Sequence, residues 1–557
     1  MLFFAHRRVL THSRLQAKAI RIILLIVLGL FSFVGFIGRA EAHAALEATT
    51  PAADSRLDAA PPAVEVVFNE RLDSGGARLL VLNESSRNVA KGKVERIDEG
   101  KGIRIALPKL EDGHYTVSYS VISADGHPIS GAYVFTVGNP APLPDANQLD
   151  PHQQVGHAHN HGGAGLTVDS FLLYTARILY YAGLLATAGI ALWGLMRRAT
   201  PVVRDTLARS LGLAGKFAFI ATLAYVFFSL RDLGQGEPIS EWWRILTETT
   251  IGKLYCAELL LAVAAPLLPS LSAIPRVVWA ALALFAEAWS GHAAAFNPIA
   301  YTVGLDYAHL LAASLWGGGL VLLLAIWYKE RPEAGRFALL FSKWALVSFL
   351  VLWVTGVLST LEFLPSLSYL KYTLWGKWLL AKVALSVLVA VTAFLIRKQM
   401  KKGDLPRGSL LKVDVGLLAA IVLSVGVLTY QTPLPANKPL NYHKMGIDMH
   451  VTLRVSPNTP GDNQFTLKIW LPETVGEGKP KKVQLRMLPL DKKDMGYIDV
   501  PLEPYEDQEI DEFPNYVIST YKAQGPYLPF AGEWKAQIRV TDATDTERVL
   551  ETTYRIY

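Results

Sequence analysis

The sequence predicts a multi-domain membrane protein, in which an N-terminal all-β sandwich and a C-terminal all-β sandwich flank an eight-helix transmembrane bundle. Three observations support this fold class. Hydrophobic residues make up 51% of the 557 residues, eight long apolar segments occupy the middle of the chain, and short segments of β-branched and aromatic residues occur on both sides of them. The formal net charge of +6 is explained by basic loops on one side of a membrane, so no nucleic-acid partner is expected.

Residues 1–42 are typical of a secretory signal peptide. Basic residues precede an apolar run over residues 22–37, and Ala40-Glu41-Ala42 supplies the small residues of a cleavage site. The run is shorter than the roughly 20 residues of a spanning helix, which favours cleavage over the alternative of an uncleaved anchor. Cleavage after Ala42 makes His43 the first residue of the mature chain, so that its α-amine and its imidazole can bind one metal ion together.

Residues 43–138 are expected to form the first β-sandwich, with strands at 64–68, 78–82, 102–107, 114–121 and 131–137. Asp125 and His127, before the last strand, are two residues apart, so extended backbone projects both side chains the same way. With His43 they offer three nitrogens and one oxygen, a donor set that suits Cu(II). Disulfides within the chain and thiolate metal sites are excluded because the only cysteine is Cys256.

This segment resembles the CopC family of extracytoplasmic copper-binding domains. The resemblance is carried by His43-Ala44, Pro51, the strand at 64–68, Asp112–Val117 and Ser123–Gly131. It implies that copper is the bound metal and that His43, Asp125 and His127 are its Cu(II) ligands. The methionine-rich Cu(I) site of some members is not matched, and His114 is expected to be a strand residue rather than a fourth ligand.

Residues 139–167 are expected to be a His-rich linker. Prolines end the β-pattern at its start and glycines close it, and between them lie His152, His157, His159 and His161. A short His-rich tract can collect Cu(II), Zn or Ni loosely, and it can equally be a solvated spacer. Both interpretations stay open.

Residues 168–430 are expected to form the transmembrane bundle. Apolar stretches able to cross a hydrocarbon core of about 30 Å lie at 171–195, 211–230, 252–269, 275–291, 307–328, 337–361, 375–396 and 412–430. If residue 43 lies outside, the odd-numbered connections are cytoplasmic, and these hold most of the loop Lys and Arg. We therefore expect a multi-pass plasma-membrane protein with both β-sandwiches outside the cell.

Ionisable side chains are expected in the outer half of this bundle, where they are costly and therefore functional or mutually paired. They are Glu258, Glu287, His292, Asp306, His309 and Lys382. Asp306 and His309 share one helical face and can join His292 in a nitrogen–oxygen metal site. The alternative is a salt-bridge network of the glutamates with Lys382 or Arg177.

The membrane part resembles the CopD copper-transport family over all eight predicted helices. Ser290–Ala293, Asp306–Gly319 and Trp375–Val383 carry the resemblance. From this family we carry over only His292, Asp306 and His309 as candidate copper ligands. A CopC-like and a CopD-like domain in one chain is the arrangement of YcnJ-like copper-uptake proteins.

Residues 437–557 are expected to form the second β-sandwich, with strands at 449–455, 464–471, 483–487, 532–540 and 551–556. Pro529–Trp534 resembles a motif of the YtkA-like domains that are appended to some copper proteins. Near the start lie His443, Met445, Met449 and His450. Such a set can hold Cu(I), but a strand with its methionine in the core is the favoured interpretation.

Together these features predict a copper-binding membrane protein that captures Cu(II) outside the cell membrane and mediates copper uptake. Its expected partners are the copper ion, the lipid bilayer, an extracytoplasmic copper donor and a cytoplasmic copper acceptor. No catalytic residue and no enzyme activity are expected. Copper resistance by export, and a haem-binding redox protein with His292 and His309 as axial ligands, are the alternatives. No exit path is predicted, because the inner half shows only hydroxyls such as Thr355 and Ser424.

Overall fold

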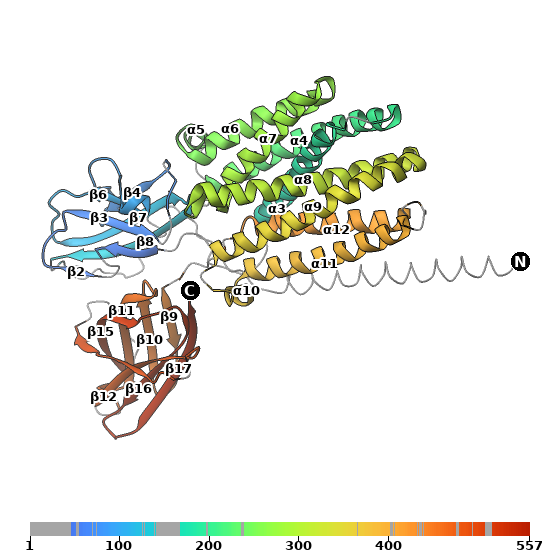
Figure 1. Cartoon of the computed structure of the whole chain (residues 1–557). Coiled ribbons are helices and arrows are strands. Elements are labelled where there is room, and N and C mark those ends of the chain that lie inside the picture. The colour runs from blue at the N-terminus through green and yellow to red at the C-terminus, as the bar shows by residue number, and fades with distance from the viewer. Residues whose placement is uncertain are drawn as a thin grey trace, which may run out of the picture.

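Both β-sandwiches lie at the same end of the helical bundle, which we call the domain-bearing end (Figure 1). This arrangement, seen in a computed structural model, confirms the predicted fold class. The described residues are 46–51, 55–68, 71–73, 75–124, 126, 128–138, 140, 168–196, 199–234, 239–364, 366–401, 405, 407–431, 433, 437, 439–474, 478–492, 494–506 and 515–557. The predicted signal peptide, His43, Asp125, His127 and the linker histidines lie outside them.

The N-terminal sandwich has two four-stranded sheets, with the orders β1-β3-β6-β5 and β2-β8-β7-β4. Its strands are β1 (Leu46–Thr50), β2 (Arg56–Leu57), β3 (Ala63–Phe68), β4 (Arg78–Leu82), β5 (Glu95–Ile97), β6 (Gly102–Ala106), β7 (Gly113–Ile122) and β8 (Pro128–Val137). Alternate residues of each strand fill the core between the sheets, as Val64, Val66 and Phe68 of β3 do. The predicted strands are all present, and the short β1, β2 and β5 were missed.

The turn between β7 and β8 is the part of this sandwich that bears on function. The two strands pair up to Ile122 and Pro128, so five residues connect them. Gly126 has a φ of +84°, a conformation that residues with a Cβ rarely adopt. This explains why glycine separates Asp125 from His127 in the sequence.

Eight helices among the described residues are long and apolar enough to cross a membrane. They are α3 (Val168–Trp193), α4 (Pro201–Leu233), α6 continued by the 3₁₀ helix η3 (Thr250–Ser270), α7 (Ala273–Ser290), α8 (Ile299–Lys329), α9 (Arg331–Phe363), α11 (Leu374–Met400) and α12 (Gly408–Leu428). Every predicted span is present. Pro266 and Pro269 lie in η3, where the missing backbone N–H groups disfavour a regular α-helix.

Two shorter helices lie at the domain-bearing end. They are α5 (Ile239–Glu248) and α10 (Tyr369–Tyr372). Mean hydropathy misses α5 because it is amphipathic: Ile245 is buried, whereas Trp243 is 71% exposed. α5 directly precedes α6, and this junction is where the N-terminal sandwich makes contact.

The C-terminal sandwich packs a five-stranded sheet, β14-β15-β11-β10-β9, against a four-stranded sheet, β13-β12-β16-β17. Its strands are β9 (Leu440–Lys444), β10 (His450–Ser456), β11 (Gly461–Pro472), β12 (Lys482–Pro489), β13 (Ile498–Val500), β14 (Glu503–Tyr505), β15 (Tyr516–Leu528), β16 (Gly532–Thr541) and β17 (Glu547–Ile556). Trp534 is fully buried at its centre. The Arg555 guanidinium stacks 3.9 Å from the ring centroid of Tyr372, which joins this sandwich to α10.

The His and Met side chains near the start of this sandwich differ in burial. Met449 is buried in the core, which confirms the favoured interpretation, whereas Met445 is 59% exposed. His443 Nδ1 lies 2.7 Å from Thr452 Oγ1, and the His450 ring packs edge-on against Tyr516 with centroids 4.6 Å apart. The alternative set of Cu(I) ligands is thus divided between the core and the surface.

The stability of this sandwich is expected to depend on pH through His450. Burial lowers the pKa of His450, and the neighbouring His443 lowers it further. The unfolded chain, with a histidine pKa near 6.5, therefore takes up a proton at a higher pH than the folded domain does. The contribution of neutral His450 to the free energy of unfolding should be complete above about pH 6.5. The free energy of unfolding should decrease as the pH falls below that value.

Hydrogen exchange of the β10 and β11 amides in the full chain, corrected for intrinsic rates, measures this effect. His450→Gln should remove most of the loss of protection at acidic pH, and His114→Gln, in the other sandwich, should leave it unchanged. Equal pH dependence in wild type and His450→Gln would contradict the assignment.

Candidate functional site

The N-terminal sandwich docks on the bundle through Asp73, which is 6% exposed. Its Oδ1 accepts hydrogen bonds from the amides of Gly75 and Thr250, both at 3.0 Å, and its Oδ2 accepts from Thr250 at 3.1 Å and Ile251 at 3.2 Å. Thr250 and Ile251 open α6, whose first amides have no partner within the helix and carry partial positive charge. A carboxylate from one domain therefore caps a helix of the other.

The β7–β8 turn lies against the same helix. A Cβ built on Gly126 would come within 3.1 Å of the Ile251 side chain, and a Cβ on Gly75 within 2.7 Å of the Glu248 carbonyl oxygen. Ile122, at the end of β7, is buried within the apolar core of the bundle. Gly126 also lines a cavity inside the bundle, so the turn that bears the predicted ligands Asp125 and His127 borders this cavity.

Removing the Asp73 carboxylate should loosen this contact. Loss of a helix cap costs about 1 kcal/mol, so Asp73→Ala should shift the opening equilibrium of the first α6 amides roughly fivefold. Hydrogen exchange of Thr250 and Ile251 in the full protein in detergent measures the change.

Asp58→Ala is the matched control, because Asp58 is an exposed aspartate of the same sandwich. Equal exchange in both variants would show that Asp73 does not hold the two domains together.

The cavity has a volume of about 550 Å³ and extends from Gly126 toward Val389 and Leu418. Most of its wall is apolar and aromatic, with Trp316, Phe349 and Trp353 among the lining residues. Its polar side chains lie on α3, α4, α6, α7, α8, α11 and the segments that follow α7 and α12. They are Arg177, Tyr181, Tyr225, Ser229, Asp232, Tyr255, Glu287, Ser290, His292, Asp306, His309, Lys382, Thr429 and Tyr430, with Ser359, Thr360 and Ser386 beside them.

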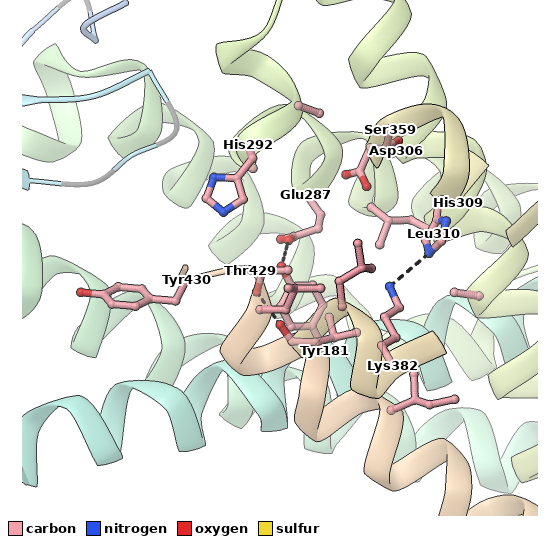
Figure 2. A pocket seen from close by; sticks show the side chains of 18 of the residues that line it. Tyr181, Glu287, His292, Asp306, His309, Leu310, Ser359, Lys382, Thr429 and Tyr430 are labelled. Atoms are coloured by element: carbon pink, nitrogen blue, oxygen red, sulfur yellow. Dashed lines mark hydrogen bonds between the residues drawn. The ribbon is translucent and has the colours of Figure 1, made fainter. Parts of the chain in front are cut away.

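Glu287 projects into this cavity from α7 and is held by two phenols of α3. The Tyr180 hydroxyl donates to Glu287 Oε2 at 2.9 Å, and the Tyr181 hydroxyl donates a short hydrogen bond to Oε1. Figure 2 shows Tyr181 directed at the Glu287 carboxylate, with His292 and Asp306 nearby. Two hydrogen bonds thereby stabilise this buried carboxylate.

The two cations that line the cavity, Arg177 and Lys382, have other partners. Arg177 donates from Nη2 to the Thr429 carbonyl at 2.9 Å and to Thr429 Oγ1 at 3.1 Å, and it stacks on the ring of Tyr225. Lys382 Nζ lies 3.5 Å from His309 Nε2. Within the described part of the chain neither cation forms a salt bridge with Glu258 or Glu287, so the salt-bridge alternative is wrong.

The three predicted membrane ligands all line the cavity, but the structure does not assemble them into one site. His309 Nδ1 lies 2.8 Å from Thr355 Oγ1, and its Nε2 faces Lys382, as Figure 2 shows. Asp306 is within electrostatic range of both His292 and Lys382. Among the described residues no three His, Cys, Asp or Glu side chains are grouped to hold a metal ion. The expected joint site of His292, Asp306 and His309 is therefore not formed in this state.

The same contacts disfavour an axial haem ligand at His309. One ring nitrogen is satisfied by a hydroxyl, and the other points at an ammonium group that occupies the place of an iron ion. The haem-binding alternative thus lacks one of its two ligands in this geometry.

One buried acid of the opposite half was missed. Asp414, near the start of α12, is 3% exposed, and the Thr392 hydroxyl of α11 lies 2.6 Å from its Oδ1. The expectation that this half of the bundle contains no polar groups other than hydroxyls was therefore wrong. The sequence signal that reveals Asp414 is a lone carboxylate within an apolar segment. Thr355 contacts His309 and Ser424 lies near the end of α12, so both belong to the domain-bearing half.

The fold and the cavity define a multi-pass membrane protein with a docked soluble domain. Residues 46–138 match the CopC domain, and residues 167–302 match the copper resistance protein D-like, N-terminal domain. The first match spans the N-terminal sandwich, and the second runs from α3 to the start of α8. The chain therefore has a fused architecture, in which a CopC domain precedes a CopD-like membrane domain.

The chain is also similar to individual proteins. The chain is 29% identical over 463 residues to the copper transport protein CutJ of Bacillus subtilis (strain 168), which covers 77% of this chain and 82% of that protein. It is 34% identical over 98 residues to protein YobA of Escherichia coli (strain K12), covering 17% of this chain and 79% of YobA. The crystal structure of CopC from Methylosinus trichosporium OB3b aligns with 18% of this chain and 99% of its own, at 29% identity and a TM-score of 0.16. The YtkA-like resemblance of residues 437–557 stays a prediction.

Proposed function

We propose that this protein captures Cu(II) outside the cell membrane with its N-terminal sandwich and passes copper into the membrane cavity for uptake. The observation that carries the proposal is the position of Gly126. This residue stands between Asp125 and His127 in the sequence, and it lines the cavity that contains Glu287, His292 and Asp306. A copper ion released near this turn has a direct way into the bundle.

The capture site of the proposal consists of His43, Asp125 and His127. The CopC match covers residues 46–138, and Escherichia coli copper resistance protein C is 34% identical over 106 residues, 18% of this chain and 83% of that protein. Imidazole nitrogens, a terminal amine and a carboxylate are ligands that Cu(II) prefers. Cleavage after Ala42 is needed for the amine, so signal-peptide removal is part of the proposal.

The passage through the bundle begins at His292 and the two carboxylates behind it. Glu287 and Asp306 line the domain-bearing half of the cavity and offer carboxylate oxygens to an entering cation. His292, in the segment after α7, offers an imidazole at the same level. Copper ligation by His309 requires Lys382 to move away from Nε2. We therefore propose that copper reaches His309 after His292 and Asp306.

Loop charge supports the orientation with both sandwiches outside. Lys and Arg concentrate at the bundle end opposite the sandwiches, where Arg204, Arg276, Lys329, Arg336 and Arg397 lie. Inward movement of copper from an extracytoplasmic donor to a cytoplasmic acceptor agrees with the name of CutJ, a copper transport protein. The name of copper resistance protein C suits the alternative, export.

Copper uptake by cells that produce the full chain tests the proposal. Cells with the wild-type chain should accumulate more copper than cells without it, and Asp125→Ala with His127→Ala should reduce the gain at least roughly tenfold, because both side chains are proposed ligands. Asp58→Ala should leave uptake unchanged. Lower cellular copper in the presence of the wild-type chain would instead establish export, and a Soret band in the purified protein would establish haem binding.

The role of the N-terminal amine is tested separately. The mature N-terminus is determined by mass spectrometry, and the Cu(II) EPR spectrum of the full protein is compared with that of a variant carrying one extra residue before His43. The extra residue should change the spectrum and weaken Cu(II) binding. Identical spectra and affinities would remove the amine from the ligand set.

A further inference from the structure

Glu258 of α6 is a buried carboxyl group that the proposed copper path does not use. It is 4% exposed, and neither of its carboxylate oxygens has a hydrogen-bond partner among the described residues. It lines a second, small cavity of about 20 Å³ together with Tyr180, Thr222 and Trp279. This volume is sufficient for one water molecule.

The polar groups around Glu258 provide no counter-charge at its oxygens. Thr222 donates its hydroxyl hydrogen to the Ala218 carbonyl, and the Trp279 indole donates to the Leu261 carbonyl, so neither donates to Glu258. The ionisable groups that face it from the surrounding helices are Arg177 and Tyr180 of α3, Tyr225 of α4, Glu287 of α7 and, on its own helix, Tyr255. Arg177 is committed to Thr429 and Tyr225. A bare ionised carboxylate is unfavourable in such a place, and the neutral acid is favoured.

Tyr180 connects Glu258 to the main cavity. It lines the small cavity beside Glu258, and its hydroxyl donates to Glu287 Oε2 at 2.9 Å. Its oxygen keeps lone pairs that can accept a hydrogen bond from Glu258, directly or through one water molecule. Glu287 lines the main cavity, so Tyr180 connects the lining of the small cavity to a carboxylate of the large one.

We propose that Glu258, Tyr180 and Glu287 form a proton relay that releases one proton into the main cavity when a copper ion enters it. Glu258 gives its proton to the Tyr180 oxygen while the Tyr180 hydroxyl proton passes to Glu287. Tyr180 is unchanged, Glu258 becomes a carboxylate, and Glu287 becomes a carboxylic acid that then loses the proton to cavity water. No electron is transferred, and the charge of the incoming ion is partly offset by the ionised Glu258.

The release step rests on the proposed function, because it requires copper in the cavity, whereas storage of a proton on Glu258 does not. Storage is tested by infrared spectroscopy of the full protein at about neutral pH, where exposed carboxyl groups are ionised. The wild type should show a carboxylic-acid C=O band that Glu258→Gln lacks. Glu362→Gln, which changes an exposed glutamate of α9, should retain it. Identical spectra of wild type and Glu258→Gln would overturn the proposal.

The relay is tested by adding Cu(II) or, separately, Cu(I) to the wild type. The amount of copper added exceeds what the soluble domain can bind. Copper should remove the Glu258 band, and Tyr180→Phe should keep the band in place after copper addition, because the phenol hydroxyl that carries the proton is missing. The matched control is Tyr301→Phe, a tyrosine of α8 that is 41% exposed. A band that copper removes equally in Tyr180→Phe would exclude Tyr180 from the relay.

Copper uptake into vesicles containing the same proteins separates the two proposals. Uptake by the wild type with an unchanged Glu258 band overturns the relay and leaves copper transport intact. No uptake by the wild type overturns the proposed function, and the comparison with Glu258→Gln still decides whether Glu258 stores a proton.

Discussion

The arrangement of this molecule depends on one hydrogen-bonded contact, the Asp73 carboxylate on the first amides of α6. A helix that starts at the edge of a membrane exposes N–H groups that need acceptors, and here a separate domain supplies them. The contact fixes direction as well as distance, because two oxygens accept from two successive residues. The same junction places Gly126 of the β7–β8 turn against Ile251, at the edge of the cavity.

Inside the bundle, Glu287, Arg177 and Lys382 mostly contact neutral groups. Phenol hydroxyls hold the Glu287 carboxylate, a carbonyl and a hydroxyl hold Arg177, and an imidazole faces Lys382. In direct ion pairs, adjacent cations would neutralise the carboxylates, which would then attract a passing cation less strongly. The observed partners leave the cavity charged in its domain-bearing half, which suits a route for a cation better than a purely structural network does.

The sequence was sufficient for the eight spans and for the strands with clear alternation, because their signals are local, whereas β1, β2, β5 and α5 were missed. Apolar length marked the spans and alternation marked the strands, and the order of the spans brought Glu287, His292, Asp306 and His309 to one level of the bundle. The sequence did not predict the hydrogen-bonding partners of these side chains, because the partners depend on how each helix is rotated by packing against its neighbours. Asp73 and Thr250 are 177 residues apart, and Lys382 faces His309 rather than a glutamate. The capture ligands His43, Asp125 and His127 remain predictions.

The shape of the large cavity has a consequence for the ion itself. Its volume of about 550 Å³ is many times what a single water molecule needs, so an ion within it can keep most of its hydration shell. The cavity ends at Val389 and Leu418, and the next polar pair along these two helices is Thr392 with Asp414. An ion that moves from this end of the cavity to that pair must lose hydration water, which is the costly step for any small cation in a bilayer. Selection between ions of similar charge would take place there.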